Sequence, residues 1–218
     1  MAITDESGII FLVTSLAAYC WYWILHSGPD PNRYDPNSEI IPLAGPIDYR
    51  YNRLKGADTY YFPVNEEITA QLAATFFLLT DRHAEDRAKV PSEKLNVQGR
   101  TLFVPKAARG VAMFSFKRLC ANPLGPADYL AIARTYHTVI MVAIPQFSKE
   151  SSDAARRFIT LIDALYEYSV KFLCSATVPL QSLYLEGNAS FEFERTVSRL
   201  MEMQSEDYLT RGHGKASV

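Results

Sequence analysis

The sequence predicts an α/β domain in which helices flank a mixed, mostly parallel sheet. Residues 138–144 form a continuous apolar run ended by Pro145, a pattern typical of strands covered on both faces. A helical pattern follows, with an apolar stripe at Phe158, Leu161, Ile162 and Leu165. Residues 170–174 are again strand-like, so the three segments predict a βαβ unit, whose two strands pair in parallel.

The composition predicts an ordered chain without a nucleic-acid partner. The 218 residues suffice for one large domain or two small ones, and 48% are hydrophobic, which argues against global disorder. The formal net charge is −2, from 22 basic and 24 acidic residues, whereas nucleic-acid binding needs a strong basic excess. Cys20, Cys120 and Cys174 lie far apart, so they indicate a reducing compartment rather than a disulfide framework or metal site.

Residues 1–28 form an apolar N-terminal segment. Its residues 8–25 carry no charge and would rise about 27 Å as a helix, close to the roughly 30 Å hydrocarbon core of a membrane. Acidic residues precede the run and Arg33 follows it, so a spanning helix would leave the bulk of the chain cytoplasmic, at the inner face of the inner membrane. Three interpretations stay open: a membrane anchor, a core element and a non-native start.

Residues 29–44 are predicted to be a proline-rich linker, because no helix or central strand tolerates their proline density. Strand-like stretches follow at 47–54 and 59–62. Asn65 is placed to cap a helix whose first turn is acidic. Apolar residues then recur at helical spacing at Ile68, Leu72, Phe76 and Leu79.

The middle of the chain predicts a hairpin, a strand and a helix. Residues 95–97 and 101–104 flank Gln98-Gly99, which is typical of a hairpin turn. Residues 111–116 form a short apolar strand pattern. A helix is expected over 126–134, because proline suits its first turn and Asp128 favours its positive end.

The last helices complete the predicted domain. Ser151 or Ser152 is expected to cap the helix of the βαβ unit. A final helix is expected over residues 191–203, with Phe193, Val197 and Leu200 on one face. The sequence after Tyr208 is polar, so residues 210–218 are predicted to be a flexible tail.

Most patterns that carry chemistry are absent from the 218 residues. The only Gly-Lys pair, Gly214-Lys215, lacks the earlier glycine and the following helix of a phosphate loop, and strand 138–144 ends without a carboxylate for magnesium. The four histidines have no metal-ligand spacing, and His137 is predicted to be structural. Ser115 and Ser175 lie at strand ends, outside any Gly-x-Ser-x-Gly motif, which argues against a hydrolase.

Arg195 and Arg199 are the candidate site residues, as nucleotide or subunit contacts. They lie four apart on one face of the last helix, beside Glu192 and Glu194. One interpretation is a solvated face with salt bridges. The other is a pair of guanidinium groups that reach the phosphates of a nucleotide bound by a neighbouring subunit.

Several long strings carry a family resemblance. They are DYR at 48–50, ARGVAMFSF at 108–116, YHTV at 136–139, ARRFITLIDALY at 155–166 and FEFERTVSRLMEMQS at 191–205. With the shorter pieces LC, PLG and DYL between residues 119 and 130, they resemble the ZapE-like, Afg-type AAA+ ATPases. The resemblance covers residues 45–209, most of the chain, which we take as the family's carboxy-terminal region.

The resemblance implies a P-loop-NTPase-like mixed sheet with flanking helices. It also implies ATP and magnesium as cofactors, ATP hydrolysis, and a role in cell division or membrane-protein quality control. Its expected partners are further copies of the chain, subunits of family members, a division-site protein and a membrane. The family's phosphate loop and acidic strand end would precede the matched segment, so we expect a truncated form without its own hydrolytic site. The alternative is a non-enzymatic, membrane-associated interaction module.

Overall fold

The computed structural model describes residues 2–4, 10–12, 58–81, 90–184 and 190–214. The chain divides into two compact units, residues 1–43 and 44–218. In the first unit, β1 (Ala2–Thr4) pairs with the antiparallel strand β2 (Ile10–Leu12). Residues 10–12 are therefore a strand rather than part of the possible apolar helix, and their β-branched and aromatic types favour extended backbone. The rest of the apolar run, the linker and the predicted strand at 47–54 lie outside the described residues.

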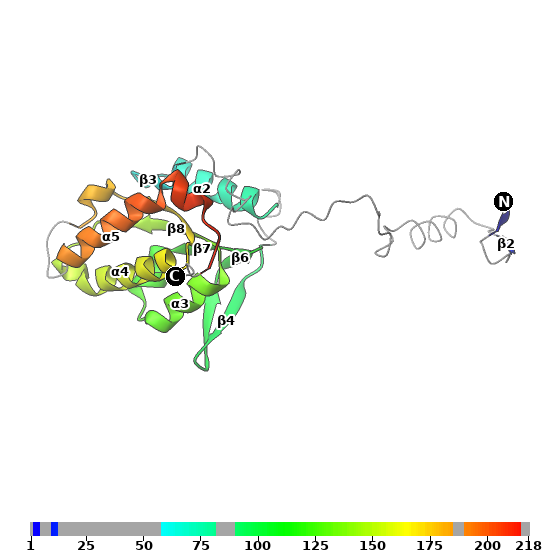
Figure 1. The fold of residues 1–218 in the computed structure, drawn as a ribbon, viewed down its shortest axis with the longest axis horizontal. Coiled ribbons are helices and arrows are strands. Elements are labelled where there is room, and N and C mark those ends of the chain that lie inside the picture. The colour runs from blue at the N-terminus through cyan, green and yellow to red at the C-terminus, as the bar shows by residue number, and fades with distance from the viewer. Residues whose placement is uncertain (1, 5–9, 13–57, 82–89, 185–189, 215–218) are drawn as a thin grey trace. The chain divides into compact units, whose positions relative to one another are not determined.

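The second unit is built on a five-stranded sheet in the order β3-β9-β8-β7-β6 (Figure 1). Strands β3, β9, β8 and β7 are parallel, and β6 pairs with β7 in the antiparallel sense. The bounds are β3 (Tyr60–Tyr61), β6 (Lys106–Ala108), β7 (Val111–Ser115), β8 (Thr138–Ile144) and β9 (Lys171–Ala176). The predicted mixed, mostly parallel sheet is thus confirmed. Among the described helices, none is long and apolar enough to cross a membrane.

Helices cover both faces of this sheet, which explains its uninterrupted apolar strands. The order β7, α3 (Pro126–Thr135), β8, α4 (Ser152–Glu167), β9 forms two consecutive βαβ units. Successive strand residues alternate between two clusters, as the pleat requires. In β8, Val139 and Met141 pack with α3, α4 and α5 (Ser190–Met203), whereas Ile140 packs with α2 (Glu66–Leu79) on the other face.

Local sequence signals explain where these elements begin. The Asn65 side chain accepts a hydrogen bond of 2.7 Å from the Ile68 N–H, so the predicted cap of α2 is confirmed. Strands β4 (Glu93–Val97) and β5 (Arg100–Val104) form the predicted hairpin as a separate two-stranded sheet. Gln98 and Gly99 have φ values of 51° and 81°, the left-handed pair of a tight hairpin turn. Short helical turns lie at Lys117–Ala121, Lys149–Ser151 and Leu180–Ser182.

The cap of α4 differs from the expectation. Ser151 does precede the helix, but its hydroxyl makes no capping hydrogen bond to α4. It instead accepts from the Ser148 N–H at 2.8 Å and donates to the Ser148 carbonyl at 3.1 Å. The serine therefore closes the preceding turn, because a hydroxyl can pair with nearby backbone groups on either side of it.

The polar end of the chain also differs from the expected flexible tail. After α6 (Glu206–Thr210), residues 211–214 are held against the domain by backbone groups. The Gly214 N–H donates to the Tyr168 carbonyl at 2.9 Å, and His213 Nε2 lies 2.8 Å from the Ala133 carbonyl oxygen. The Lys171 ammonium donates to the Arg211 carbonyl. We call residues 211–214 the docked segment; residues 215–218 lie outside the described part.

Candidate functional site

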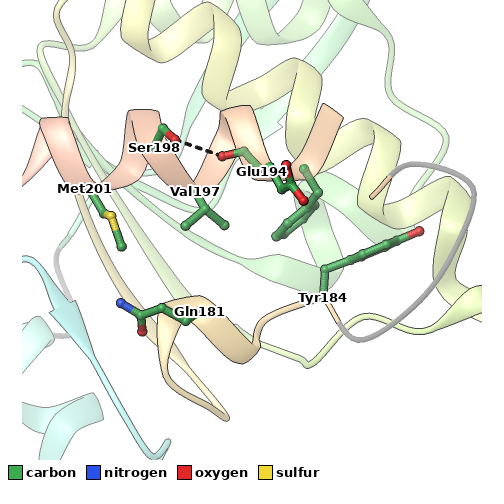
Figure 2. Close-up of a pocket in the computed structure, with 7 residues that line it drawn as sticks. Gln181, Tyr184, Glu194, Val197, Ser198 and Met201 are labelled. Atoms are coloured by element: carbon green, nitrogen blue, oxygen red, sulfur yellow. Dashed lines mark hydrogen bonds between the residues drawn. The ribbon is translucent and has the colours of Figure 1, made fainter. Parts of the chain in front are cut away.

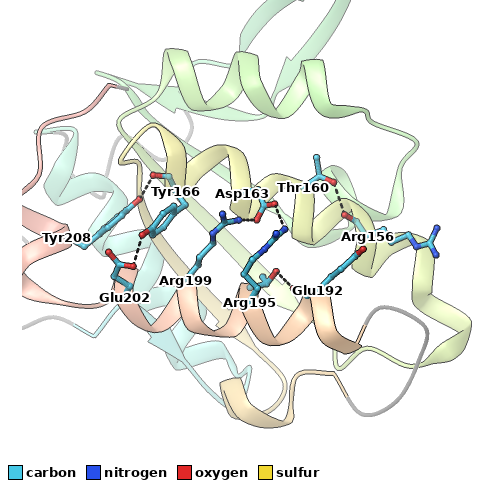
Figure 3. Close-up of polar contacts among 10 residues, drawn as sticks. Arg156, Thr160, Asp163, Tyr166, Glu192, Arg195, Arg199, Glu202 and Tyr208 are labelled. Atoms are coloured by element: carbon cyan, nitrogen blue, oxygen red, sulfur yellow. Dashed lines mark hydrogen bonds and ion pairs between the residues drawn. The ribbon is translucent and has the colours of Figure 1, made fainter. Parts of the chain in front are cut away.

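Helices α4 and α5 lie side by side and place the two candidate arginines against one carboxylate (Figure 3). The buried face of α5 consists of Phe193, Thr196, Leu200 and Met203, which recur at helical spacing. Arg195 and Arg199 flank this face, so their side chains lie along the line where α5 meets α4. We call this line of polar residues the seam. The packing of the two apolar helix faces thus determines which polar side chains meet beside the buried contact between α4 and α5.

Asp163 of α4 holds both guanidinium groups. Arg195 Nη2 lies 3.0 Å from Asp163 Oδ2, and Arg199 Nη1 donates to the other oxygen, Oδ1. The side chain of Arg195 is 57% exposed and that of Arg199 is 27% exposed. The partner is therefore on the neighbouring helix rather than among the glutamates beside them in the sequence. Two cations against one anion leave the seam locally positive.

A second polar group continues the seam towards the docked segment. The Tyr166 hydroxyl donates to Glu202 Oε2 at 2.6 Å, and Arg211 Nη2 donates to Glu202 Oε1 at 2.9 Å. The Tyr166 hydrogen bond lowers the pKa of the Glu202 carboxyl, helped by the Arg211 charge, because both stabilise the carboxylate. The Arg199 guanidinium lies 5.1 Å from the centre of the Tyr166 ring. Arg199 therefore connects the ion pairs of Asp163 with the hydrogen bonds around Glu202.

Aromatic stacking fixes the far end of the seam. The rings of Tyr166 and Tyr208 stack with centroids 5.6 Å apart and planes 20° apart. Tyr208 is fully buried, and its hydroxyl lies 3.4 Å from the carbonyl oxygens of Leu165, Tyr166 and Val170. Burial raises the pKa of Tyr208, so its hydroxyl stays protonated and serves as a donor.

The other sequence candidates are kept apart. His137 is buried, with Nε2 2.9 Å from the Arg109 carbonyl oxygen and Nδ1 2.8 Å from the Thr138 hydroxyl, as expected of a structural histidine. Ser115 ends β7, whereas Ser175 lies in β9 and accepts a hydrogen bond from the Ala143 N–H. Strand β8 separates the two serines, so they do not share a site.

The helix starts that follow β7 and β8 carry no glycine-rich phosphate loop. A phosphate loop needs glycine backbone N–H groups that face the anion at a helix N-terminus. No glycine lies between β8 and α4, and the buried Phe147 donates its N–H to the Leu183 carbonyl there. At the start of α3, the Asp128 carboxylate already accepts from the Gly125 N–H at 2.8 Å. No cluster of three His, Cys, Asp or Glu side chains occurs among the residues searched, which are the described ones.

Sequence patterns missed a groove along α5 (Figure 2). One cavity of about 480 Å³ lies between α5 and the Leu180–Ser182 turn, and one of about 260 Å³ lies between that turn, α5 and β3. Gln181 and Met201 line both cavities, which are therefore adjacent and together form the groove along α5. The helical period of α5 indicates which side chains share a face, but no local signal reveals that a distant turn lies opposite them.

Comparison with known proteins identifies the family. The family model described as AFG1-like ATPase matches residues 34–212. The cell division protein ZapE of Escherichia coli is 34% identical over 175 residues, which cover 80% of this chain and 45% of ZapE. An uncharacterized protein of Schizosaccharomyces pombe is 34% identical over 199 residues, covering 78% of this chain and 43% of its own length.

A vertebrate relative shows a similar coverage. The lactation elevated protein 1 homolog B of Danio rerio is 34% identical over 208 residues, covering 79% of this chain and 40% of its own length. The chain thus spans less than half the length of these curated relatives. No solved structure matches it. Because the family model covers most of its residues, the chain belongs to the AFG1-like ATPase family.

Proposed function

We propose that this chain is the subunit-contacting region of an AFG1-like ATPase. In this proposal, Arg195 and Arg199 reach phosphate groups of a nucleotide that a neighbouring subunit holds, either another copy or a related family member. The supporting observation is the shared Asp163 carboxylate, which orients both guanidinium groups and leaves the seam positive. A planar guanidinium binds phosphate through two parallel hydrogen bonds, and a carboxylate that fixes it in advance lowers the entropy cost of that contact.

The two arginines have different roles in this proposal. Arg195 is more than half exposed and makes one ion pair, so it can turn from Asp163 to a phosphate at little cost. Arg199 is held by Asp163 and by the Tyr166 ring, so it presents its guanidinium to a phosphate from a fixed position. In this proposal, ATP and magnesium are held outside the described residues.

Substitution of each arginine by lysine tests the subunit contact. Lysine keeps the charge but loses the planar fork, so Arg195→Lys and Arg199→Lys should leave thermal stability nearly unchanged, by well under about 1 kcal/mol. Both should reduce assembly with full-length Escherichia coli ZapE, or the ATPase activity of the mixture. Arg156→Lys is the matched control, because Arg156 is an exposed arginine on the neighbouring helix α4. If assembly and activity are unchanged in all three mixtures, the proposed subunit contact is wrong, and Arg195 and Arg199 belong to a solvated face with ion pairs.

Nucleotide binding by the chain alone tests the location of the ATP site. We expect a dissociation constant no better than millimolar for Mg–ATP and no hydrolysis, because the described residues offer neither a phosphate loop nor a magnesium carboxylate. Isothermal titration measures this directly. A dissociation constant near about 10 μM would place a complete nucleotide site within these 218 residues and overturn the proposal.

The biological setting follows the named relative only by analogy. One relative is a cell division protein, so we propose a role in cell division, with membrane-protein quality control as the second setting implied by the resemblance. A non-enzymatic, membrane-associated interaction module is the alternative, based on the uncharged run at residues 8–25. Cell fractionation separates these cases: if the run is an anchor, the full chain should pellet with membranes and a chain beginning at residue 29 should not.

A further inference from the structure

The groove along α5 lies where open α/β sheets bind their ligands. Strands β3 and β9 are adjacent and parallel, but β3 leads into α2 on one face and β9 leads towards α5 on the other. Ligands of such sheets bind at the carboxyl ends of strands whose connections diverge in this way. Tyr60 and Phe62 at the end of β3, and Leu180 beyond β9, line the smaller cavity. The position follows from topology and is independent of the arginine seam.

The shape of the groove suits a short extended chain. Its lining follows α5 from Phe193 to Met201, and Gln204 continues it. Helix residues from 193 to 204 would rise about 16 Å, at roughly 1.5 Å each. An extended peptide of about five residues has the same length, at roughly 3.3 Å per residue. A groove of this length therefore accommodates alternate side chains of one short strand.

The walls are apolar and partly open to solvent. Phe62 is 49% exposed and Met201 is 45% exposed, although both are large apolar side chains. Phe191, which is 84% exposed, lies on the same face of α5 as Glu194 and Met201, at spacings of three and ten residues. Methionine adapts its shape to different apolar partners. Figure 2 shows Val197 and Met201 of α5 facing the exposed Gln181 amide across the opening.

The charge of the groove selects among ligands. Glu194 lines the larger cavity, and no lysine or arginine lines either cavity among the described residues. Phosphates and acidic peptides would meet only negative charge there, whereas a lysine or arginine side chain would find a partner at the Glu194 end.

We propose that this groove binds an extended peptide segment of another protein, in which two alternate bulky apolar side chains are followed by a basic one. The apolar side chains occupy the two cavities, and the basic one reaches Glu194. Exposed side-chain amides such as that of Gln181 are suited to pair with the peptide backbone. This surface is separate from the proposed subunit contact and does not depend on it.

Fluorescence polarisation with labelled pentapeptides and the full chain tests the proposal. The probes are Phe-Ser-Leu-Ser-Lys and its reverse, since alternate side chains of a strand point to the same side. In matched probes, glutamate replaces lysine, or alanine replaces the apolar pair. We expect saturable binding of a basic probe, about threefold to fivefold weaker binding of the acidic probe at low salt, and loss of binding by the alanine probe.

Two variants and a control localise the binding. Ser198→Trp fills the larger cavity from an exposed helix position, so it should weaken the basic probe more than about tenfold. Glu194→Lys should reverse the preference between basic and acidic probes. Glu67→Lys makes the same charge change at the exposed start of α2, on the other face of the sheet, and should change nothing.

Several outcomes would overturn the proposal. One is that no probe saturates the chain up to about 1 mM. The others are that basic and acidic probes bind equally, or that Ser198→Trp binds the basic probe as well as the unchanged chain does. Displacement of the probe by Mg–ATP would assign the groove to a nucleotide. A dimer that Ser198→Trp dissociates in analytical ultracentrifugation would assign it to a second copy of the chain. Failure of the nucleotide and assembly tests above would leave the probe results unaffected.

Discussion

The two edges of the parallel sheet, where its strands begin and where they end, differ in what lies over them. At the edge where β7, β8 and β9 begin, the Gly110 carbonyl accepts from the His137 N–H at 2.9 Å, and the docked segment covers Lys171. At the opposite edge, where these strands end, lie the α5 groove and exposed side chains such as Ser115. The amino edge is thus covered by segments of the chain itself, whereas the carboxyl edge carries the groove for which we propose binding, at the usual ligand position of α/β sheets.

Loss of the aromatic anchor of the amino edge should have the largest effect. Tyr208→Ala removes a fully buried ring beneath the docked segment, so we expect a loss of about 3–5 kcal/mol in the free energy of unfolding. Tyr184→Ala at the groove removes a half-buried ring and should cost about 1 kcal/mol. Urea denaturation of both variants measures the difference. Equal losses would show that the two edges contribute equally to stability.

A single methyl group added at Gly110, on the amino edge, should have the next largest effect on stability. Gly110 has a φ of 74°, and a Cβ there would lie 2.6 Å from His137 Cδ2, so Gly110→Ala combines strain with a clash. We expect a loss of about 2–4 kcal/mol in unfolding free energy. Gly99→Ala is the control, because its φ is 81° but no atom lies within 4 Å of the added Cβ. It should cost only about 1 kcal/mol, from strain. Thermal denaturation measures the stability of both variants. A similar loss of stability at the two glycines would contradict the tight contact between Gly110 and His137.

The smallest expected effect is a pH dependence at the polar seam. The folded pKa of Glu202 is lowered, so its ionised form stabilises the fold above the unfolded pKa of about 4.3. This contribution is lost as pH falls through the folded pKa. Because the side chain is 41% exposed, the total is well under about 1 kcal/mol. Glu202→Gln should therefore show a flatter fall in stability between pH 7 and about pH 3, and an identical fall would remove Glu202 as a contributor.

Local signals were sufficient for most elements of the sheet domain. The apolar run of β8 and the turn at Gln98-Gly99 are short-range patterns, so the sequence indicated them correctly. The docked segment escaped prediction because backbone groups hold it, and its side chains are polar. Polarity alone thus did not distinguish a solvated tail from a hydrogen-bonded one.

The sites were predicted less completely than the fold. Arg195 and Arg199 were chosen as candidates from their spacing, and their role as a site stays a prediction; their partner Asp163 lies 36 residues from Arg199 and is reached only through helix packing. The groove draws on β3, the Leu180–Ser182 turn and α5, three segments that the sequence does not connect. Periodicity reports which face of an element is buried, but it does not report which distant face lies opposite.

The docked segment also makes the chemical reactivity of Lys171 a measure of local opening. The Lys171 ammonium donates to the Arg211 carbonyl, and the residue is only 2% exposed. An amine-reactive reagent must reach this ammonium, so it modifies Lys171 only when the docked segment leaves the domain. The labelling rate of Lys171 in the folded protein would therefore report how often residues 211–214 detach without unfolding of the sheet.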